Sequence, residues 1–226
     1  MQCMTRSASK LTASAGRPRE FDLDEALDAA VLVFRERGFS AGSIGELSRA
    51  TGLTTGSLYK AFPDKRALFL AALNHYASQR SLQLRALVAA ESTGLAKLRA
   101  LLGFYATSAH GVEGQRGCLV VSAVEELSIL DAEVAAAVVE TASRSREIIF
   151  GLVRVGQNDG SVVADLPADT LADAVFAFTQ GLRILGKLGR DHAETEAMAD
   201  VALAMLTPHA TALHHFSESA FTGDPS

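Results

Sequence analysis

The sequence predicts an all-α protein, with a small N-terminal helix-turn-helix domain followed by a larger helical domain. Residues 43–62 form two short amphipathic segments separated by a glycine turn, which is the pattern of a helix-turn-helix. From about Ala67 onward the chain is rich in Ala and Leu at helical spacing, with no convincing alternating strand. The predicted division is an arm over 1–19, the helix-turn-helix domain over 20–66, the helical domain over 67–207 and a tail over 208–226.

The arm carries four basic residues and no acidic one, among many Ser, Ala and Gly residues. Such a segment is typical of a chain that is disordered when free and then follows a phosphate backbone or enters the minor groove. Arg17 and Arg19 are therefore candidate DNA contacts. The alternative, an inert solubilising tail, fits residues 1–12 better than it fits these two arginines.

The first predicted helix begins at Asp22, which can cap its first turn. Glu25 follows three residues later, and Phe21 can pack over the turn. An apolar stripe then recurs at helical spacing and Gly38 is the expected end. This helix is long enough to brace the two that follow it as a three-helix domain.

The two helices of the motif have clear start and stop signals. Ser43 and Glu46 form a capping box, Gly52 is suited to the left-handed conformation past a helix end, and Thr54 can cap the second helix. Leu58, with Phe62 four residues later, faces the core.

The second helix of such a motif lies in the major groove of DNA. Its open face carries small hydroxyl side chains, a tyrosine and a lysine, and Gly56 allows close approach. Lys65 follows Asp64, the expected cap of the next helix. A positive charge is unfavourable at a helix N-terminus unless an anion such as a DNA phosphate binds there. The alternative is that Lys65 is a solvated surface charge. We expect Tyr59 and Lys65 to contact phosphates. The full set of candidates is Arg17, Arg19, Ser43, Thr54, Thr55, Gly56, Ser57, Tyr59, Lys60 and Lys65.

Over about residues 16–75 the chain resembles the DNA-binding domain of the TetR family of bacterial transcriptional regulators. The resemblance is carried by Gly16-Arg-Pro-Arg19, the Phe34…Gly38-Phe39 spacing, Gly56-Ser-Leu-Tyr59, Phe62 and Lys65. It implies an all-helical homodimer that binds an inverted repeat in double-stranded DNA. It also implies a C-terminal domain that binds a small effector and forms the dimer. Most members are repressors released by their ligand; the residues do not exclude activation.

Charge and composition agree with local contact to DNA. The chain has 21 basic and 26 acidic residues, but residues 1–66 hold 10 basic against 8 acidic and the remainder 11 against 18. The longest stretch without charges, 201–217, contains a proline and three histidines, so we expect no membrane span. There is no signal-peptide pattern, and Cys3 and Cys118 do not suggest a disulfide framework. We therefore expect a soluble, cytoplasmic protein.

The second domain is predicted as a series of helices with a long rod at its start. Turn residues separate them at 110–117, which is polar and glycine-containing, and at 156–160. The predicted helices are Ala67–Val88, Leu95–Ala109, Leu119–Leu130 and Asp131–Val155.

Two further helices, Asp169–Gly186 and Asp191–Met205, end the domain, the second with a capping box from Asp191 and Glu194. They have more apolar surface than one monomer needs to bury. In the resemblance this pair packs against its twin as a four-helix bundle. The alternative is that these apolar side chains belong to the core of a single monomer, and it fits about half of them.

A ligand pocket between helices needs an apolar lining with a few polar groups, and we expect it to bind a small, largely apolar molecule. Each candidate also fits a role in the core, a cap or the surface. Arg116-Gly-Cys-Leu-Val-Val-Ser122 resembles a segment beside the pocket in one branch of the family, where Asn is common at the position of Ser122. The candidates are Phe104, Tyr105, Cys118, Ser122, Glu125, Phe150, Phe176 and Gln180.

Three other functions are alternatives to a ligand-released repressor. Cys118 precedes an apolar helix, where a thiolate is stabilised, so the chain could sense oxidants or electrophiles; a small cysteine that simply packs is commoner. For an enzyme there is no phosphate loop, His-Glu-x-x-His motif or zinc spacing, and we expect no catalytic residue, cofactor or metal. A nucleoid architectural protein is disfavoured by the acidic C-terminal domain.

Overall fold

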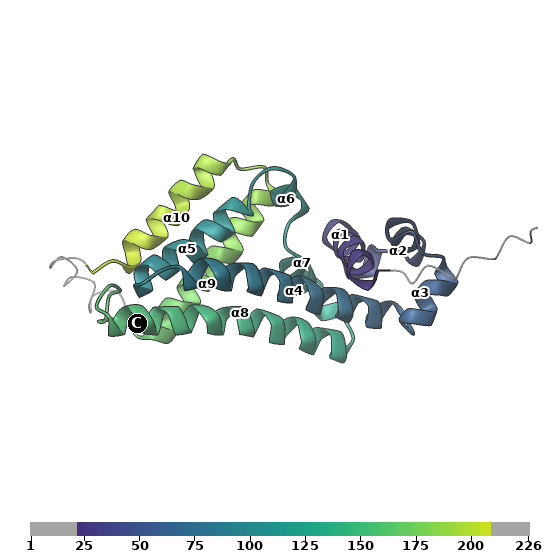
Figure 1. Ribbon diagram of the computed structural model, residues 1–226, viewed down its shortest axis with the longest axis horizontal. Helices are drawn as coiled ribbons and strands as arrows, with labels where there is room; N and C mark the ends of the chain where they lie inside the picture. Colours follow the sequence, from purple (N-terminus) through teal and green to yellow (C-terminus); the bar gives the residue numbers. More distant parts are fainter. Residues whose placement is uncertain (1–21, 209–226) are drawn as a thin grey trace, which may run out of the picture.

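A computed structural model describes residues 22–208. The predictions for Arg17 and Arg19, for the arm and for the tail beyond Pro208 therefore lie outside the described residues. Within this range the regular structure is entirely helical, as predicted. The molecule is elongated, with α1 to α3 at one end and α5, α9 and α10 towards the other (Figure 1). No helix in this range is long and apolar enough to cross a membrane.

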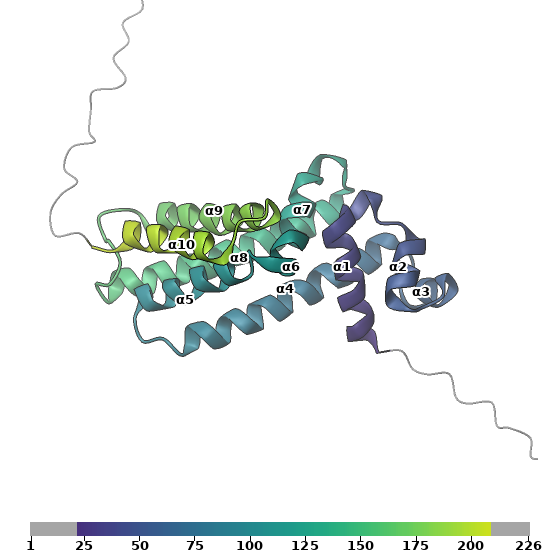
Figure 2. The same cartoon turned by 90° about the horizontal axis from the view of Figure 1, so that it is seen from above.

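The N-terminal domain consists of α1 (Leu23–Ala41), α2 (Ile44–Thr51) and α3 (Thr55–Ala61). Its predicted caps are confirmed: Asp22 accepts from the N–H of Asp24, Ser43 and Glu46 form the capping box, and Thr54 accepts from the N–H of Ser57. Gly52 has φ +68°, the left-handed conformation expected after α2. Figure 2 shows α1 crossing α4, with α2 and α3 outermost.

Gly38 does not end α1 but kinks it. With φ +78° it breaks the helical path, and a further short turn continues to Ala41. The kink brings the Phe39 ring to 5.0 Å from the Phe69 ring, centroid to centroid, and Phe69 in turn packs edge-on against Phe34. The aromatic side chains on both sides of the kink therefore join the core, which the prediction of a simple helix end did not anticipate.

α4 runs without interruption across residue 66, where the sequence predicts the boundary between the two domains. The polar segment 110–117 folds as a helix, and the predicted helix 119–130 breaks after Glu125. The elements are α4 (Lys65–Ala89), α5 (Gly94–Thr107), α6 (Gly111–Arg116), α7 (Leu119–Glu125), the 3-10 turn η1 (Leu127–Ile129), α8 (Ala132–Asn158), α9 (Ala168–Lys187) and α10 (His192–Leu206).

The predicted turn at Gly156 was wrong, because this glycine serves helix packing. α8 continues through it to Asn158, and a Cβ added to Gly94 at the start of α5 would lie 2.1 Å from the Gly156 Cα. The two glycines let the backbones of α5 and α8 touch. The chain turns later, at Gly160, where φ is +77°.

Two apolar cores share α4 and α8. The first core lies among α1, α2, α3, α4, α7 and the start of α8. It contains residues such as Phe34, Phe69, Leu119 and Val134. The second lies among α4, α5, α8, α9 and α10. Because the first core includes α7 and α8, the helix-turn-helix packs directly on the larger domain.

Candidate nucleic-acid interface and internal cavity

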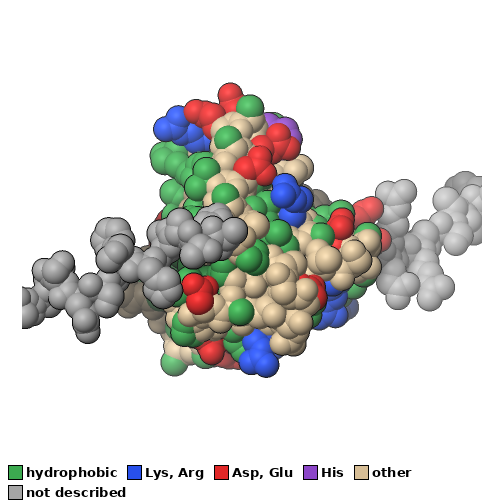
Figure 3. Space-filling view, turned by 90° about the vertical axis from the view of Figure 1, so that its left-hand side faces the viewer, with side chains coloured by type: hydrophobic (Ala, Val, Ile, Leu, Met, Phe, Trp, Pro, Cys, Tyr) green, Lys and Arg blue, Asp and Glu red, His purple; other side chains and the backbone are tan. Residues whose placement is uncertain are grey.

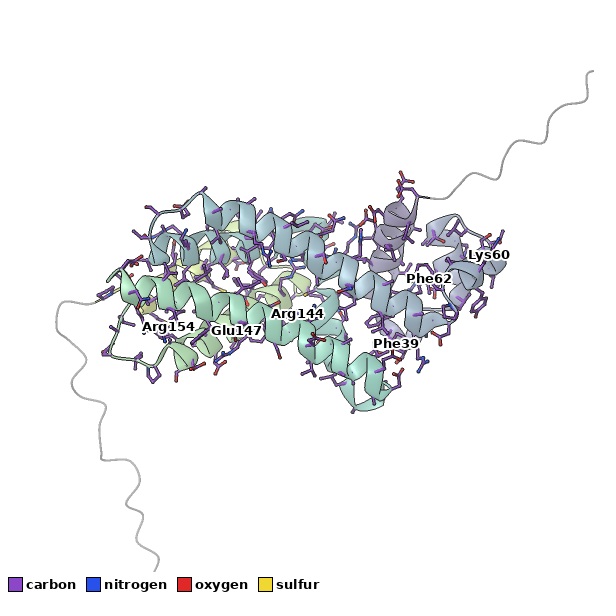
Figure 4. All side chains as sticks on the ribbon, turned by 60° about the horizontal axis from the view of Figure 1, so that its bottom comes forward. Phe39, Lys60, Phe62, Arg144, Glu147 and Arg154 are labelled. Atoms are coloured by element: carbon purple, nitrogen blue, oxygen red, sulfur yellow. The ribbon has the colours of Figure 1, made fainter. Side chains whose placement is uncertain are left out.

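The outer face of α3 is open to solvent. Thr55, Gly56, Ser57, Tyr59 and Lys60 are exposed, whereas Leu58 between them is 2% exposed and belongs to the core. Figure 4 shows Lys60 at the outer end of the domain. A helix with a buried stripe and an open face of hydroxyl, aromatic and cationic side chains can enter a major groove.

Two of the predicted contacts already serve as caps. The Ser43 hydroxyl lies 2.8 Å from Glu46 Oε2, and the Ser43 backbone N–H and hydroxyl lower the pKa of Glu46. Thr54 Oγ1 accepts from the N–H of Ser57 at 3.1 Å. Their hydroxyls set the starts of α2 and α3, and a contact with DNA would come in addition.

Lys65 has internal partners that the sequence did not indicate. Its Nζ donates to the carbonyl oxygens of Ser40 and Gly42, each at 3.2 Å, and lies 4.7 Å from the centroid of the Phe39 ring. The ammonium group therefore ties the start of α4 to the turn that precedes α2. The phosphate contact expected of Lys65 stays a prediction, now with a structural role beside it.

A cavity of about 70 Å³ lies among α4, α5, α8 and α9, with the start of α7 at one side. The structure brings together five of the predicted pocket residues, from α5, the start of α7 and α9, and adds apolar residues from α4, α5 and α8, including Leu84, Leu101 and Ile148. The five are Phe104, Tyr105, Cys118, Phe176 and Gln180.

Ser122, Glu125 and Phe150 do not line this cavity. Ser122 is buried elsewhere on α7, and Glu125 is exposed. On α8 the stripe that faces the cavity contains Ile148, and Phe150, two residues on, points about 200° away around the helix. The ring of Phe150 instead lies 5.7 Å from the guanidinium carbon of Arg146.

A surface groove of about 640 Å³ between α4 and α8 leads to the cavity. The groove and the cavity share Ala77, Ser81 and Ser145 in their walls. Arg85, Arg144 and Glu147 also line the groove, and Figure 4 shows Arg144 and Glu147 along α8. A small molecule could therefore enter between the two longest helices.

Two buried arginines meet at one carbonyl next to the cavity. Arg35 on α1 donates to the Gly117 oxygen through Nε (2.9 Å) and Nη2 (2.7 Å), and Arg183 on α9 donates to it through Nη2 (2.8 Å). Arg35 also pairs with Glu113 at 3.0 Å, and the two guanidiniums beside Glu113, from Arg35 and Arg116, keep its pKa low against the effect of burial. The same peptide thus joins the DNA-binding domain to α9.

Sequence reasoning missed both arginines. Each lies in an apolar helical stretch, as in Gly181-Leu-Arg-Ile-Leu185, and is at most 5% exposed. An arginine inside an apolar stripe is the signal that could have found them, because a buried cation needs polar partners.

Cys118 follows that carbonyl and faces the cavity. The Tyr76 hydroxyl donates to its Sγ at 3.7 Å. Burial by itself would raise the pKa of the thiol. The Arg183 guanidinium, the N–H of Val121, the Tyr76 hydroxyl and Arg80 together outweigh burial, so the pKa is lowered from its ordinary value. Burial also raises the pKa of Tyr76, so that hydroxyl remains a donor.

The other end of α7 holds the turn before the helix-turn-helix. Glu126, directly after α7, accepts from the N–H groups of Phe39 and Ser40, each at 2.9 Å, and from the Ser40 hydroxyl at 2.5 Å. α7 therefore connects the cavity, at Cys118, with the kink of α1, at Glu126. The sequence did not indicate this contact of Glu126 with the kink of α1.

α9 and α10 carry an exposed apolar surface formed by Ile184, Leu188, Val201 and Met205, which are 47%, 74%, 58% and 64% exposed. In Figure 3 apolar side chains gather along one flank of the upper part of the molecule, where α10 lies. Phe176, on the same helix as Ile184, is partly buried and lines the cavity. The structure therefore places this predicted pocket residue at the cavity.

Two family descriptions match the chain. "Bacterial regulatory proteins, tetR family" matches residues 26–72, and "Tetracyclin repressor-like, C-terminal domain" matches residues 94–202. Curated relatives include the HTH-type transcriptional repressor ComR of Escherichia coli K12, 26% identical over 82% of this chain and 89% of the relative. Another is the HTH-type transcriptional repressor DhaR of Mycobacterium sp. GP1, 28% identical over 78% of this chain and 87% of the relative.

Solved structures share the fold along most of the chain. One is a cysteine mutant of the TetR family transcriptional regulator CifR in complex with 26-base-pair double-stranded operator DNA. It is 30% identical to this chain, covers 83% of it and 98% of its own length, and superposes with a TM-score of 0.73. A TetR family regulator from Agrobacterium tumefaciens, 20% identical, superposes with a TM-score of 0.75 over 82% of this chain and 97% of its own.

Proposed function

The chain belongs to the TetR family of bacterial regulatory proteins, and on that premise we propose that it is a sequence-specific transcriptional repressor, active in the cytoplasm, that a small effector releases from its operator. The observation that carries the proposal is the link between two sites. An open recognition face on α3 lies at one end of the molecule, and a cavity lies behind α7, whose far end holds the turn before α2. The relatives ComR and DhaR are named repressors, and the CifR structure contains operator DNA.

DNA recognition would use two copies of α3, one from each protomer of a homodimer, in successive major grooves of an inverted repeat. Thr55, Ser57 and Lys60 would lie near base edges. Tyr59 and Lys65 would contact phosphates, which position the protein without reading sequence.

Release requires that the effector favour a conformation in which the two recognition helices no longer match the grooves. An effector in the cavity would press on Cys118 at the start of α7. Because Glu126 holds the N–H groups of Phe39 and Ser40, a shift of α7 would move the turn that precedes α2. A coupling of about 1–3 kcal/mol would change operator affinity roughly 5- to 150-fold.

The test begins with DNA upstream of the gene and of its neighbours. Full-length protein should protect an inverted repeat there from nuclease and bind it at least about a thousandfold more tightly than a scrambled duplex of equal length. Thr55→Ala should relax this preference. Equal affinity for the operator and the scrambled duplex would mean that the chain does not read sequence.

A second candidate function, sensing of electrophiles through Cys118, is favoured by the lowered pKa of this thiol and its position at the cavity. With N-ethylmaleimide, the thiolate sulfur would bond to one alkene carbon and the other alkene carbon would take a proton from water. In a Cys3→Ser background the reagent should abolish operator binding, and the added Cys118→Ser change should prevent this. Loss of DNA binding in both variants would exclude Cys118 as the sensor.

The pH dependence of this reaction follows from the direction of the shift. Because the pKa of Cys118 is lowered, the thiolate persists below the ordinary thiol pKa of about 8.5 and is lost only as the pH falls through the lowered value. The rate of alkylation in Cys3→Ser protein should therefore fall to half of its plateau at a pH below the ordinary thiol pKa of about 8.5. Arg183→Gln removes the largest stabilising influence and should move this fall to higher pH.

A further inference from the structure

Arg80 on α4 lies at the cavity inside a group of aromatic rings. Its guanidinium carbon is 4.3 Å from the centroid of the Phe104 ring, 5.7 Å from that of Tyr105 and 5.8 Å from that of Tyr76. Among the described residues its one hydrogen bond runs from Nη2 to the Ser108 hydroxyl at 3.2 Å. A guanidinium has five N–H donors, so most of them remain available to a molecule in the cavity.

The described lining of the cavity holds one cation, Arg80, and no carboxylate. No Asp or Glu of residues 22–208 lines it, and within that range neither Arg80 nor Arg183 forms an ion pair. Arg183, behind the cavity and 2% exposed, has a buried Nε without a partner among the described residues. A buried cation is costly without a compensating negative charge, so the site favours an anion.

The remaining wall suits an apolar body. From Tyr76 to Leu84 the cavity follows about two turns of α4, roughly 12 Å. Leu84, Leu101, Ile148 and Phe176 line it away from the charged end. The groove that leads inward is lined by Arg85, Arg144 and Glu147. Arg144 already pairs with Glu140, whereas Arg85 forms no ion pair with the described residues, so Arg85 is the cation there that would attract an anion.

We propose that the effector is a small carboxylic acid with an apolar body, bound as its carboxylate. The carboxylate pairs with Arg80 in a planar, two-point contact, and the body lies against Leu84, Leu101 and Phe176. The proposal rests on the effector release proposed above and specifies its chemistry. It also revises the largely apolar ligand expected from the sequence, because that expectation did not include the guanidinium at the cavity.

The thiol of Cys118 gives an independent readout. Its negative form is stabilised in part by Arg80, the same cation that an incoming carboxylate would meet. A bound carboxylate should therefore compete with the thiolate and raise the pKa of Cys118, whereas a neutral molecule of the same shape should not.

The experiment compares matched probes on full-length dimeric protein: octanoate with 1-octanol, and phenylacetate with 2-phenylethanol. Calorimetric titration should give at least one carboxylate a Kd about tenfold or more below that of its alcohol, since a charge-assisted pair is roughly twice as strong as a neutral one. In Arg80→Gln the ratio should fall to about one, and Arg80→Lys should keep part of it. Arg154→Gln, an exposed change on α8, is the control and should keep the full ratio.

Three results would overturn the inference: alcohols that bind as tightly as their acids, selectivity that survives in Arg80→Gln protein of unchanged helical content, or no carboxylate binding in either pair. Operator release by the same probes separates this inference from the proposed function. Carboxylates that bind through Arg80 but leave operator affinity unchanged would support the anion site and contradict the switch. Alcohols that release the operator as well as the acids do would support the switch and contradict the anion site.

Discussion

Among single residues, the basic side chains at the DNA-binding end differ in what they already contact. Lys60 is exposed and makes no hydrogen bond or ion pair with the described residues, whereas Lys65 is partly buried and holds two carbonyl oxygens of the turn before α2. Charge alone would treat the two lysines alike. The structure predicts different consequences for their loss.

Lys65→Ala should have two effects. It should lower the free energy of unfolding by about 1 kcal/mol, because two carbonyl oxygens lose a charged donor that is partly open to solvent. It should also reduce the slope of log affinity against log salt by roughly one per half-site, equally on all operators. Denaturant melts and anisotropy titrations at several salt concentrations measure both effects.

Lys60→Ala is the matched control, expected to weaken operator binding without changing the melt. An unaltered melt in Lys65→Ala would contradict the carbonyl contacts. An unaltered salt slope would contradict the phosphate contact.

For single residues, the sequence predicted the contacts between near neighbours in the chain but not those between distant residues. The caps at Asp22, Ser43 and Thr54 follow from neighbours two or three residues away, and all were predicted. The partners of Arg35 and Glu126 are 78 to 87 residues distant, and no local pattern indicates which group will meet them.

Among the secondary-structure elements, α7 and the kink of α1 act as one unit. Gly38 has φ +78°, and a Cβ there would lie 2.0 Å from Glu126 Oε1. Gly52 has a similar φ of +68° but nothing within 4 Å of such a Cβ. Alanine at Gly52 would therefore introduce backbone strain alone, whereas alanine at Gly38 would also disturb the contact with Glu126 after α7.

Gly52→Ala should cost about 1–2 kcal/mol of unfolding free energy, the ordinary price of a left-handed conformation for alanine. Gly38→Ala should cost about 1.5 kcal/mol more, because the Glu126 carboxylate must leave the N–H groups of Phe39 and Ser40. Urea melts of both variants test this difference. In a Glu126→Ala background the two costs should become equal; a persistent difference would show that the carboxylate is not its source.

Helix existence was predictable and helix interruption was not. Apolar periodicity located α4, α5, α8, α9 and α10, but it could not reveal α6, which is polar and only six residues long. It also placed a turn at Gly156, because glycine at a helix crossing and glycine in a turn look the same until the neighbouring helix is known.

For the whole molecule, the apolar surface on α9 and α10 lies where the dimer would form. Val201→Arg should shift the protein from dimer to monomer in analytical ultracentrifugation, because the arginine would be buried without a partner between protomers. Ile129→Arg, which changes a residue of similar exposure in η1, should leave the dimer intact. Dimers of unchanged stability in Val201→Arg would remove this surface from the interface.

The cavity was the hardest feature to predict, because its members come from five helices. The five predicted residues that line the cavity are aromatic, amide or thiol side chains in or next to apolar helices. The three that lie elsewhere differ in helical phase, which a pattern without neighbours does not settle. Arg80 was missed because, on sequence alone, a charge in a long helix reads as solvated.

The shared oxygen of Gly117 has a consequence for pharmacology. Arg35 and Arg183 both donate hydrogen bonds to it, so this one oxygen, beside Cys118, connects α1 with α9. A molecule that binds in the cavity without moving the Gly117 peptide would fill the effector site, and the protein would stay on its operator. We therefore expect antagonists, which are compounds too small to displace the segment around Gly117. In a competition assay they should prevent the inducer from releasing the operator, and alone they should cause no release.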